Sequence, residues 1–147
     1  MRHALIVAVI IILDQVTKSL ISTNIELHQS FPVIGGIFHF TLVHNTGAAF
    51  GFFKGMYHFI IFLSVVTIFL IVLYPNRFRY GYNHLRIGLL FILAGTIGNL
   101  IDRLSCGYVI DFIDLRIWPV FNVADMAITI GGAFLVYHIL IFKKVAS

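Results

Sequence analysis

Long runs of apolar residues, separated by shorter polar stretches, dominate the sequence. A helix that crosses the hydrocarbon core of a bilayer needs about 20 such residues, at about 1.5 Å of rise each. Four runs come close to this length, at about residues 3–21, 56–74, 85–101 and 123–142. The pattern predicts an all-α membrane protein with four transmembrane helices, and the whole chain, 1–147, is expected to form a single integral membrane domain.

A different pattern occupies the connection between the first two runs, at about 24–55. There Phe38, Phe40 and Leu42 alternate with polar residues, and glycines punctuate a stretch rich in aromatic and β-branched side chains. Alternation with a period of two is typical of a strand with one buried face. The sequence therefore predicts a small extramembrane β-layer on the outer face of the membrane.

Composition agrees with a membrane protein. Hydrophobic residues make up 60% of the chain and charged residues 11%, with a mean hydropathy of +1.00. A soluble domain carries roughly a quarter charged residues, because its surface must face water. The net charge of +4 is not gathered into a face or a stripe, so no nucleic-acid partner is expected.

The basic residues indicate which way the chain crosses the membrane, because Lys and Arg are enriched on the cytoplasmic side. Those at the chain ends and around the link between the second and third runs share one side of a four-span topology: Arg2, Arg77, Arg79, Arg86, Lys143 and Lys144. Both termini are therefore expected in the cytoplasm, and the connections 22–55 and 102–122 outside. The first run is expected to remain uncleaved, because Asp14 and Lys18 interrupt it and no pattern of small residues follows.

Most of the acids fall at membrane depth or at its boundary, where an ionisable side chain is costly and needs a partner or a function. Asp102, Asp111 and Asp125, together with Asn122, lie in one layer near the outer interface of the predicted topology. Asp14 lies deeper, roughly 16 Å along the first helix. The topology is assigned from Lys and Arg alone, and in that topology three of the acids fall in one layer. The positions of the basic residues and of the acids therefore agree.

Structural roles remain open for several of these residues. An intrahelical ion pair, an interfacial anchor and a helix cap are the simplest, formed by Asp14–Lys18, Asp102–Arg103 and Asn122–Asp125 respectively. Asp111 has no such explanation, because apolar residues surround it in sequence. Glu26 and Asp114 lie in the outer connections and are expected to be solvated.

The sequence offers little support for a catalytic centre based on a thiol, a metal ion or a serine–lysine pair. The single cysteine, Cys106, excludes an intrachain disulfide and a cysteine-based metal cluster, and is expected to be a half-buried filler. The seven histidines, including His39 and His44, match no standard zinc spacing, so interfacial or packing roles are expected. Ser19 and Lys18 are adjacent on a helix and do not face each other. No metal or cofactor is expected, and a pair of carboxylates remains for hydrolysis.

Two carboxylates in a partly desolvated site share a proton, because they cannot both ionise cheaply. The ionised member can take a proton from water while the protonated member donates to an amide carbonyl. Asp111 and Asp125 are the predicted pair, since neither has an adjacent basic residue. Four further polar residues are candidates for positioning the water, the carboxylates or the substrate: Asn45, Asn99, Arg103 and Asn122.

Two other functions are open on these residues. A small proton- or ion-coupled transporter also places acids in a membrane, although it favours acids spread through the bilayer depth. A noncatalytic membrane scaffold explains the four spans and leaves Asp111 without a role.

Five short runs carry a resemblance to a known family, and they occur in its order along the chain. They are Asp14–Lys18, Asn45–Phe50, Gly95–Arg103, Val109–Phe112 and Phe121–Asp125. In these runs the chain resembles the bacterial lipoprotein signal peptidases (signal peptidase II). It departs from the family pattern at Ala94, where a glycine is common, and at His44.

The resemblance implies an aspartic endopeptidase of the bacterial cytoplasmic (inner) membrane, with its active site near the outer, periplasmic face. Such an enzyme removes the signal peptide of diacylglyceryl-modified prolipoproteins, cutting before the lipidated cysteine. The inhibitor globomycin is expected to occupy the same site, the β-layer to form a cradle, and the chain to be a monomer. By position the catalytic pair maps to Asp111 and Asp125. The supporting residues map to Asp14, Lys18, Asn45, Asn99, Asp102, Arg103 and Asn122.

Overall fold

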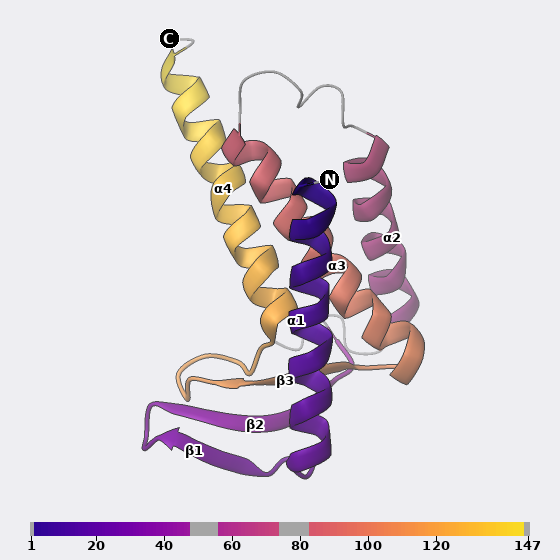
Figure 1. Cartoon of the computed structure of the whole chain (residues 1–147), viewed down its shortest axis with the longest axis vertical. Helices are drawn as coiled ribbons and strands as arrows, with labels where there is room; N and C mark the ends of the chain where they lie inside the picture. Colours follow the sequence, from indigo (N-terminus) through magenta and orange to yellow (C-terminus); the bar gives the residue numbers. More distant parts are fainter. Residues whose placement is uncertain (1, 48–55, 74–82, 146–147) are drawn as a thin grey trace.

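The structure is a computed structural model that describes residues 2–47, 56–73 and 83–145. Four helices run alongside one another, and a small sheet lies at one end of them (Figure 1). In chain order the elements are α1 (Arg2–Asn24), β1 (Ser30–Ile34), β2 (Phe38–Asn45), α2 (Tyr57–Leu73), α3 (Asn83–Cys106), β3 (Val109–Asp114) and α4 (Val123–Val145).

The four helices coincide with the four predicted apolar runs. Among the described residues, α1, α3 and α4 are long and apolar enough to cross a membrane. Helix α2 is equally apolar in character but has 17 described residues, or about 25 Å of helix. That α2 also crosses the membrane stays a prediction. Two regions of the predictions lie outside the described residues: Arg77 and Arg79, which the predicted orientation uses, and residues 48–55 of the predicted β-rich connection.

Helix α3 continues further than the sequence pattern predicts, because it ends at a glycine signal rather than at the last apolar residue. Gly107 has a φ of 85°, in the left-handed region that glycine adopts without strain, and its N–H donates to the carbonyl of Arg103 at 3.1 Å. Asp102 and Arg103 therefore sit on the last turns of a helix, not in the outer connection.

Small residues bring α3 and α4 into close contact. A Cβ added at Gly131 of α4 would lie 2.5 Å from the carbonyl oxygen of Gly88 on α3, and one at Gly95 would meet the carbonyl of Ala124. Interfaces between helices in membranes favour such residues, because packing rather than water exclusion holds the helices together. This close approach brings the start of α4 against α3 near Gly95.

The sheet is antiparallel, with strands in the order β1-β2-β3. The first two strands form the predicted β-layer, whereas β3 comes from the second outer connection, which the sequence pattern did not predict as a strand. Val43 pairs with Asp111 and Asn45 with Val109, so Asn45 and Asp111 are diagonal neighbours within reach of each other.

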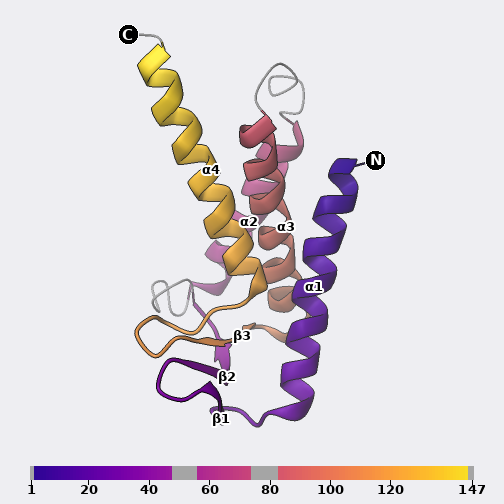
Figure 2. The same ribbon diagram turned by 60° about the vertical axis from the view of Figure 1, so that its left-hand side comes forward.

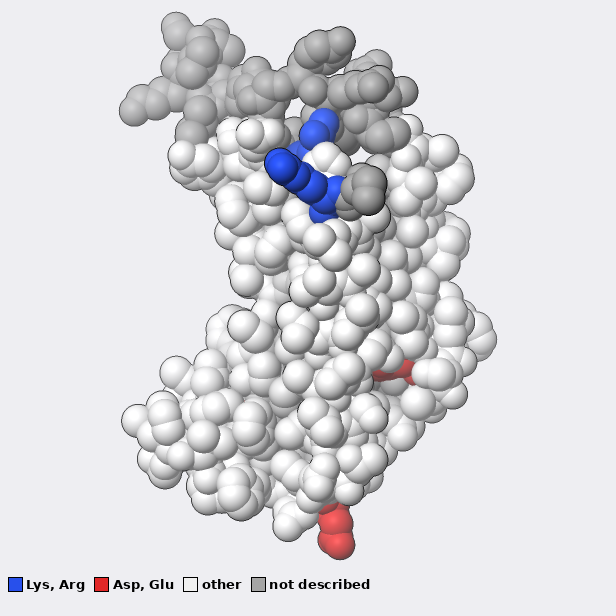
Figure 3. Space-filling model, in the orientation of Figure 1, with Lys and Arg blue, Asp and Glu red and all other residues white. Residues whose placement is uncertain are grey.

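Charge is distributed towards the two ends of the molecule. In Figures 1 and 2 helix α1 begins and α4 ends at one end, and the sheet lies at the other. On the face shown in Figure 3, the Lys and Arg side chains gather near the helix termini, and an acidic side chain marks the sheet end. Large apolar side chains are exposed on the helices in between, among them Leu5, Phe62, Phe69 and Leu140. This surface fits a lipid environment.

Candidate active site

A cavity of about 1130 Å³ opens between the sheet, the connection from β3 to α4, and helices α3 and α4. Most of its lining is apolar, with Trp118 and Phe121 from the connection and Met126 and Ile130 from α4. The polar side chains of the wall include Asn45, Asn99, Arg103, Asp111 and Asp125. A largely apolar pocket with a few convergent polar groups is typical of a binding site.

Asp111 is buried on β3, with 2% of its surface exposed. Asn45 donates from Nδ2 to its Oδ2 at 2.8 Å, and Asn122 donates from Nδ2 to its Oδ1 at 2.6 Å. Burial raises the pKa of Asp111 to about 7, and the negative charge of Asp125 contributes in the same direction, while the two amides oppose both.

Asp125 lies in the first turn of α4, where it forms the helix cap that the sequence predicts. The N–H of Asp125 donates to Asn122 Oδ1 at 2.9 Å, and the N–H of Asn122 lies 3.4 Å from Asp125 Oδ2. A cap does not account for its other contact, because Asn99 of α3 donates to Asp125 Oδ1 at 2.7 Å. Asp125 and Asp111 thus line the same cavity from two different elements.

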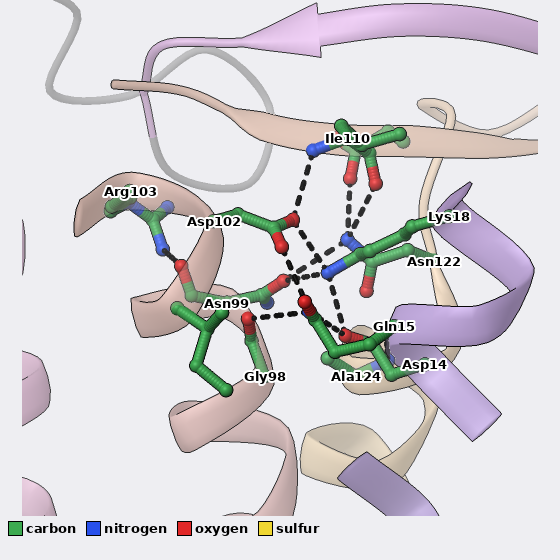
Figure 4. A network of polar contacts seen from close by, with 12 residues as sticks. Asp14, Gln15, Lys18, Gly98, Asn99, Asp102, Arg103, Ile110, Asn122 and Ala124 are labelled. Atoms are coloured by element: carbon green, nitrogen blue, oxygen red, sulfur yellow. Dashed lines mark hydrogen bonds and ion pairs between the residues drawn. The ribbon is translucent and has the colours of Figure 1, made fainter. Parts of the chain in front are cut away.

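A buried ionic centre surrounds Lys18 (Figure 4). Asn99 links it to Asp125, because Asn99 accepts from Lys18 and donates to Asp125. The ammonium group of Lys18 lies 2.8 Å from Asp14 Oδ2, 2.8 Å from Asp102 Oδ2 and 3.0 Å from Asn99 Oδ1. Lys18 and Asp14 have 1% and 0% of their surface exposed. The ion pair predicted from the i, i+4 spacing is confirmed, and it takes in a second carboxylate from α3.

The ionic centre connects α1 with three other elements. Asp14 Oδ1 accepts the N–H of Ala124 at the start of α4, at 2.8 Å. Asp102 accepts from Gln15 Nε2 at 2.9 Å and from the N–H of Ile110 on β3 at 3.2 Å. These contacts fix the ends of α3, α4 and β3 relative to one another, and so fix the carboxylates they carry.

Arg103 is buried at the edge of the same network. Its guanidinium donates to the carbonyl of Gly47 at 3.0 Å and to that of Asn99 at 3.3 Å, and Tyr57 of α2 donates to its carbonyl. Asp102 and Arg103 are 3% and 8% exposed. An anchor in the headgroup region would be solvated, so the structure does not favour that role for this pair.

Every residue predicted for the site lies in this one network. It also contains three residues for which no role was predicted, namely Gln15, Tyr57 and Gly98. Gln15 lies in the run Asp14–Lys18 that carries part of the family resemblance, so a role in the site could have been predicted for it from the sequence. Tyr57 has no comparable signal, because it opens an apolar helix.

Two predictions about residues outside the pair are wrong. Asp114 is not solvated but 6% exposed, and it accepts from Thr41 Oγ1 at 2.7 Å and from the N–H of Arg116 at 2.8 Å. Partial burial raises the pKa of Asp114, but these hydrogen bonds and the charge of Arg116 outweigh it and leave the pKa below its ordinary value. Cys106 is exposed rather than half-buried.

Four histidines pack against other rings, as expected: His44, His58, His84 and His138. His44 stacks on Tyr108 with ring centroids 3.8 Å apart, and His84 lies 3.0 Å from His138 between ring nitrogens. Burial lowers the pKa of His44, and the nearby His28 lowers it further. Within the described residues there is no group of three or more His, Cys, Asp or Glu side chains that could hold a metal ion.

Replacing Gly98 by alanine is expected to destabilise the ionic centre. The new Cβ would lie 2.7 Å from Asp14 Oδ2 and 3.3 Å from the Cβ of Ala124, and overpacking of this kind costs about 1–3 kcal/mol. The thermal unfolding midpoint in detergent should fall. Gly132→Ala is the matched control, because nothing lies within 4 Å of the added Cβ. Equal midpoints for both variants would contradict the close packing of α1 on α3.

Together the fold and the site define a membrane-embedded enzyme whose polar centre is buried at the sheet end of a helix bundle. Comparisons with known proteins identify the family to which the chain belongs. Residues 6–141 match the family model described as signal peptidase (SPase) II. The chain belongs to the signal peptidase II family and is a peptidase of that family.

Similar proteins cover nearly the full chain. The lipoprotein signal peptidase of Halothermothrix orenii is 43% identical over 144 residues, which is 97% of this chain and 98% of that one. The lipoprotein signal peptidase of Desulforapulum autotrophicum is 45% identical over 154 residues, covering 98% and 94%. A solved structure described as a bacterial membrane enzyme superposes with a TM-score of 0.93 at 31% identity, covering 99% of this chain and 92% of that one.

Proposed function

We propose that this chain is a membrane-embedded aspartic endopeptidase that removes signal peptides from diacylglyceryl-modified prolipoproteins. The observation that carries the proposal is the placement of Asp111 and Asp125 on one cavity wall, with an apolar lining beside them. A pair of carboxylates in a desolvated site can hold one proton between them, as the raised pKa of Asp111 indicates.

The reaction needs an attacking water and a proton for the leaving amine. One carboxylate takes a proton from the water as it attacks the scissile carbonyl, and the other donates a proton to the carbonyl oxygen. No covalent intermediate with the enzyme is required. Asn45, Asn99, Asn122 and Arg103 position the carboxylates or the unwound substrate backbone, and Asp14, Lys18 and Asp102 hold these groups in place.

The substrate assignment rests on the relatives and on the cavity. Several similar proteins are named lipoprotein signal peptidases. The cavity adds an apolar wall, including Trp118, Met126 and Ile130, close to the polar residues. A diacylated signal peptide is a membrane helix with acyl chains, so it can approach through the lipid and unwind where polar groups satisfy its backbone. We propose that the enzyme cleaves the peptide bond just before the lipidated cysteine.

The proposed orientation puts both termini in the cytoplasm and the cavity near the outer face of the bacterial inner membrane. Basic side chains at the end of the molecule where α1 begins support it. In this arrangement α2 is the fourth span, the segment 24–55 forms the outer β-rich insertion, and 1–147 is one domain. The chain is expected to act as a monomer, and globomycin to bind in the cavity.

A gel-shift assay tests the substrate class. Purified protein in detergent is mixed with one prolipoprotein in two forms, with and without the diacylglyceryl group on its cysteine. The lipidated form should be cut at least about tenfold faster, because burial of even a few methylene groups at about 0.8 kcal/mol each exceeds that factor. Globomycin should block the reaction. No cleavage of either form by well-folded protein would contradict the proposal and favour a transporter or a scaffold.

A further inference from the structure

The side-chain amide of Asn99, which contacts Asp125, is held in one orientation by the ammonium group of Lys18. An ammonium group has only donors, so Lys18 must face Oδ1 of Asn99, at 3.0 Å. Lys18 is itself fixed by Asp14 and Asp102, each at 2.8 Å. The Nδ2 group of Asn99 is therefore turned towards Asp125, whose Oδ1 it reaches at 2.7 Å.

The side-chain amides of Asn45 and Asn122, which contact Asp111, are oriented by backbone N–H groups. A backbone N–H can only donate, so it must face the oxygen of each amide. The N–H of Asp125 donates to Asn122 Oδ1 at 2.9 Å, and the N–H of Gly47 donates to Asn45 Oδ1 at 2.9 Å. Each amide then presents its Nδ2 group to Asp111, at 2.6 Å from Oδ1 and 2.8 Å from Oδ2. The orientations do not depend on which carboxylate is protonated.

The two carboxylates consequently have different surroundings. Both oxygens of Asp111 accept a short N–H bond, whereas Asp125 accepts one short bond on Oδ1 and has only a 3.4 Å contact, from the N–H of Asn122, at Oδ2. A protonated carboxyl oxygen is a poorer acceptor than an ionised one, so a short N–H bond to an oxygen favours the ionised form of that carboxylate. Asp125 Oδ2 is the oxygen best able to carry the proton that the pair shares.

We infer that the oriented amides divide the roles within the pair: Asp111 is the ionised base that activates water, and Asp125 carries the shared proton and acts as the acid. Asn45 and Asn122 are positioning residues that hold Asp111 ionised, and Lys18 is a positioning residue that acts through Asn99. This inference rests on the proposed function and deepens it.

The division of roles gives a balanced reaction. Asp111 takes a proton from water as the water oxygen bonds to the amide carbon, and Asp125 gives its proton to the carbonyl oxygen. The neutral tetrahedral diol then collapses: Asp111 returns its proton to the nitrogen as the C–N bond breaks, and a diol hydroxyl returns a proton to Asp125. The products are a free carboxyl group and a free amine, and the pair regains its starting state.

The pKa of Asp111 depends on the charge state of Asp125. Burial is the first cause of its rise to about 7, and the negative charge of Asp125 is the next. A proton on Asp125 removes that second cause and leaves the amide bonds, which favour ionised Asp111. The other charged or titratable groups around the pair are Asp14 and Lys18 of α1, Tyr57 of α2, Asp102 and Arg103 of α3, and His28 and His44 beside the same cavity.

The pH dependence of kcat/KM for the lipidated prolipoprotein tests the division of roles, using wild type and Asn45→Ala. The active form holds one proton on the pair, so activity should be lost on both the acidic and the alkaline side. Removing the Asn45 donor destabilises every state with ionised Asp111. The acidic limb should therefore move up by about one pH unit, the equivalent of one charge-assisted hydrogen bond, while the alkaline limb stays in place.

Asn45→Asp is the second variant, because it keeps an oxygen for the N–H of Gly47 and replaces the donor by an acceptor. It should move the acidic limb further in the same direction. Asn24→Ala, at an exposed amide that bonds only within α1, should reproduce the wild-type profile. A shift of the alkaline limb alone would reverse the roles, and unchanged limbs in folded Asn45 variants would overturn the inference. Absence of cleavage by wild type would instead refute the proposed function.

Discussion

Asp111→Asn and Asp125→Asn are each expected to lower kcat for prolipoprotein cleavage by about 1000-fold or more, since positioned acid–base groups contribute about 10²–10⁴ each. An asparagine can neither take a proton from water nor return one to the leaving amine. The two groups act as a unit, so the double variant should be little worse than either single one. Initial rates of the gel-shift assay measure this directly.

The matched control is Glu26→Gln, which removes an exposed acid between α1 and β1 and should leave the rate unchanged. Thermal unfolding of each variant, followed through the fluorescence of the single tryptophan, separates lost chemistry from lost structure. Cleavage near the wild-type rate by either asparagine variant would remove that aspartate from the proposed pair.

The second large effect concerns stability. Lys18→Ala is expected to lower the free energy of unfolding by about 3–5 kcal/mol, because it leaves buried charges without their partner. Two carboxylates, Asp14 and Asp102, would then face each other across the space that the ammonium group fills at 2.8 Å from both. The thermal midpoint in detergent should fall steeply, and cleavage should fall with it.

Arg116→Ala provides the comparison for Lys18→Ala. It also breaks an ion pair, with Asp114 at 3.2 Å, but the side chain of Arg116 is 49% exposed. An ion pair exposed on one side contributes about 0–1 kcal/mol, so this variant should stay close to wild type. A Lys18→Ala midpoint equal to that of Arg116→Ala would show that the buried ion pair does not hold the helices together.

The helices were predictable because the apolar runs are long and the membrane permits few alternatives. The ion pair was predictable for a local reason, since Asp14 and Lys18 are one helical turn apart. The topology indicated by the basic residues put Asp111 and Asp125 in one layer, and in the structure both line one cavity. The ion pair was thus predicted from local spacing, and the shared layer of the two aspartates from the number of membrane spans.

What could not be predicted depends on contacts between distant parts of the chain. Strand β3 has residues buried on both faces, so Val109–Asp114 lacks the alternation that indicated β2. Asp114 seemed solvated because its partner Thr41 is 73 residues away. The end of α3 depended on Gly107 rather than on hydropathy. The orientation of each amide depends on backbone N–H groups and on Lys18, which no motif specifies.

One measurement tests the central claim most directly: mass spectrometry of the products formed from a diacylglyceryl-modified prolipoprotein by wild type and by each asparagine variant. The proposed mechanism predicts two products from wild type alone. One is a signal peptide with a free carboxyl group, and the other is a mature chain that begins at the lipidated cysteine. Cleavage at another bond by wild type, or the same two products from folded Asp111→Asn or Asp125→Asn protein at a comparable rate, would contradict it.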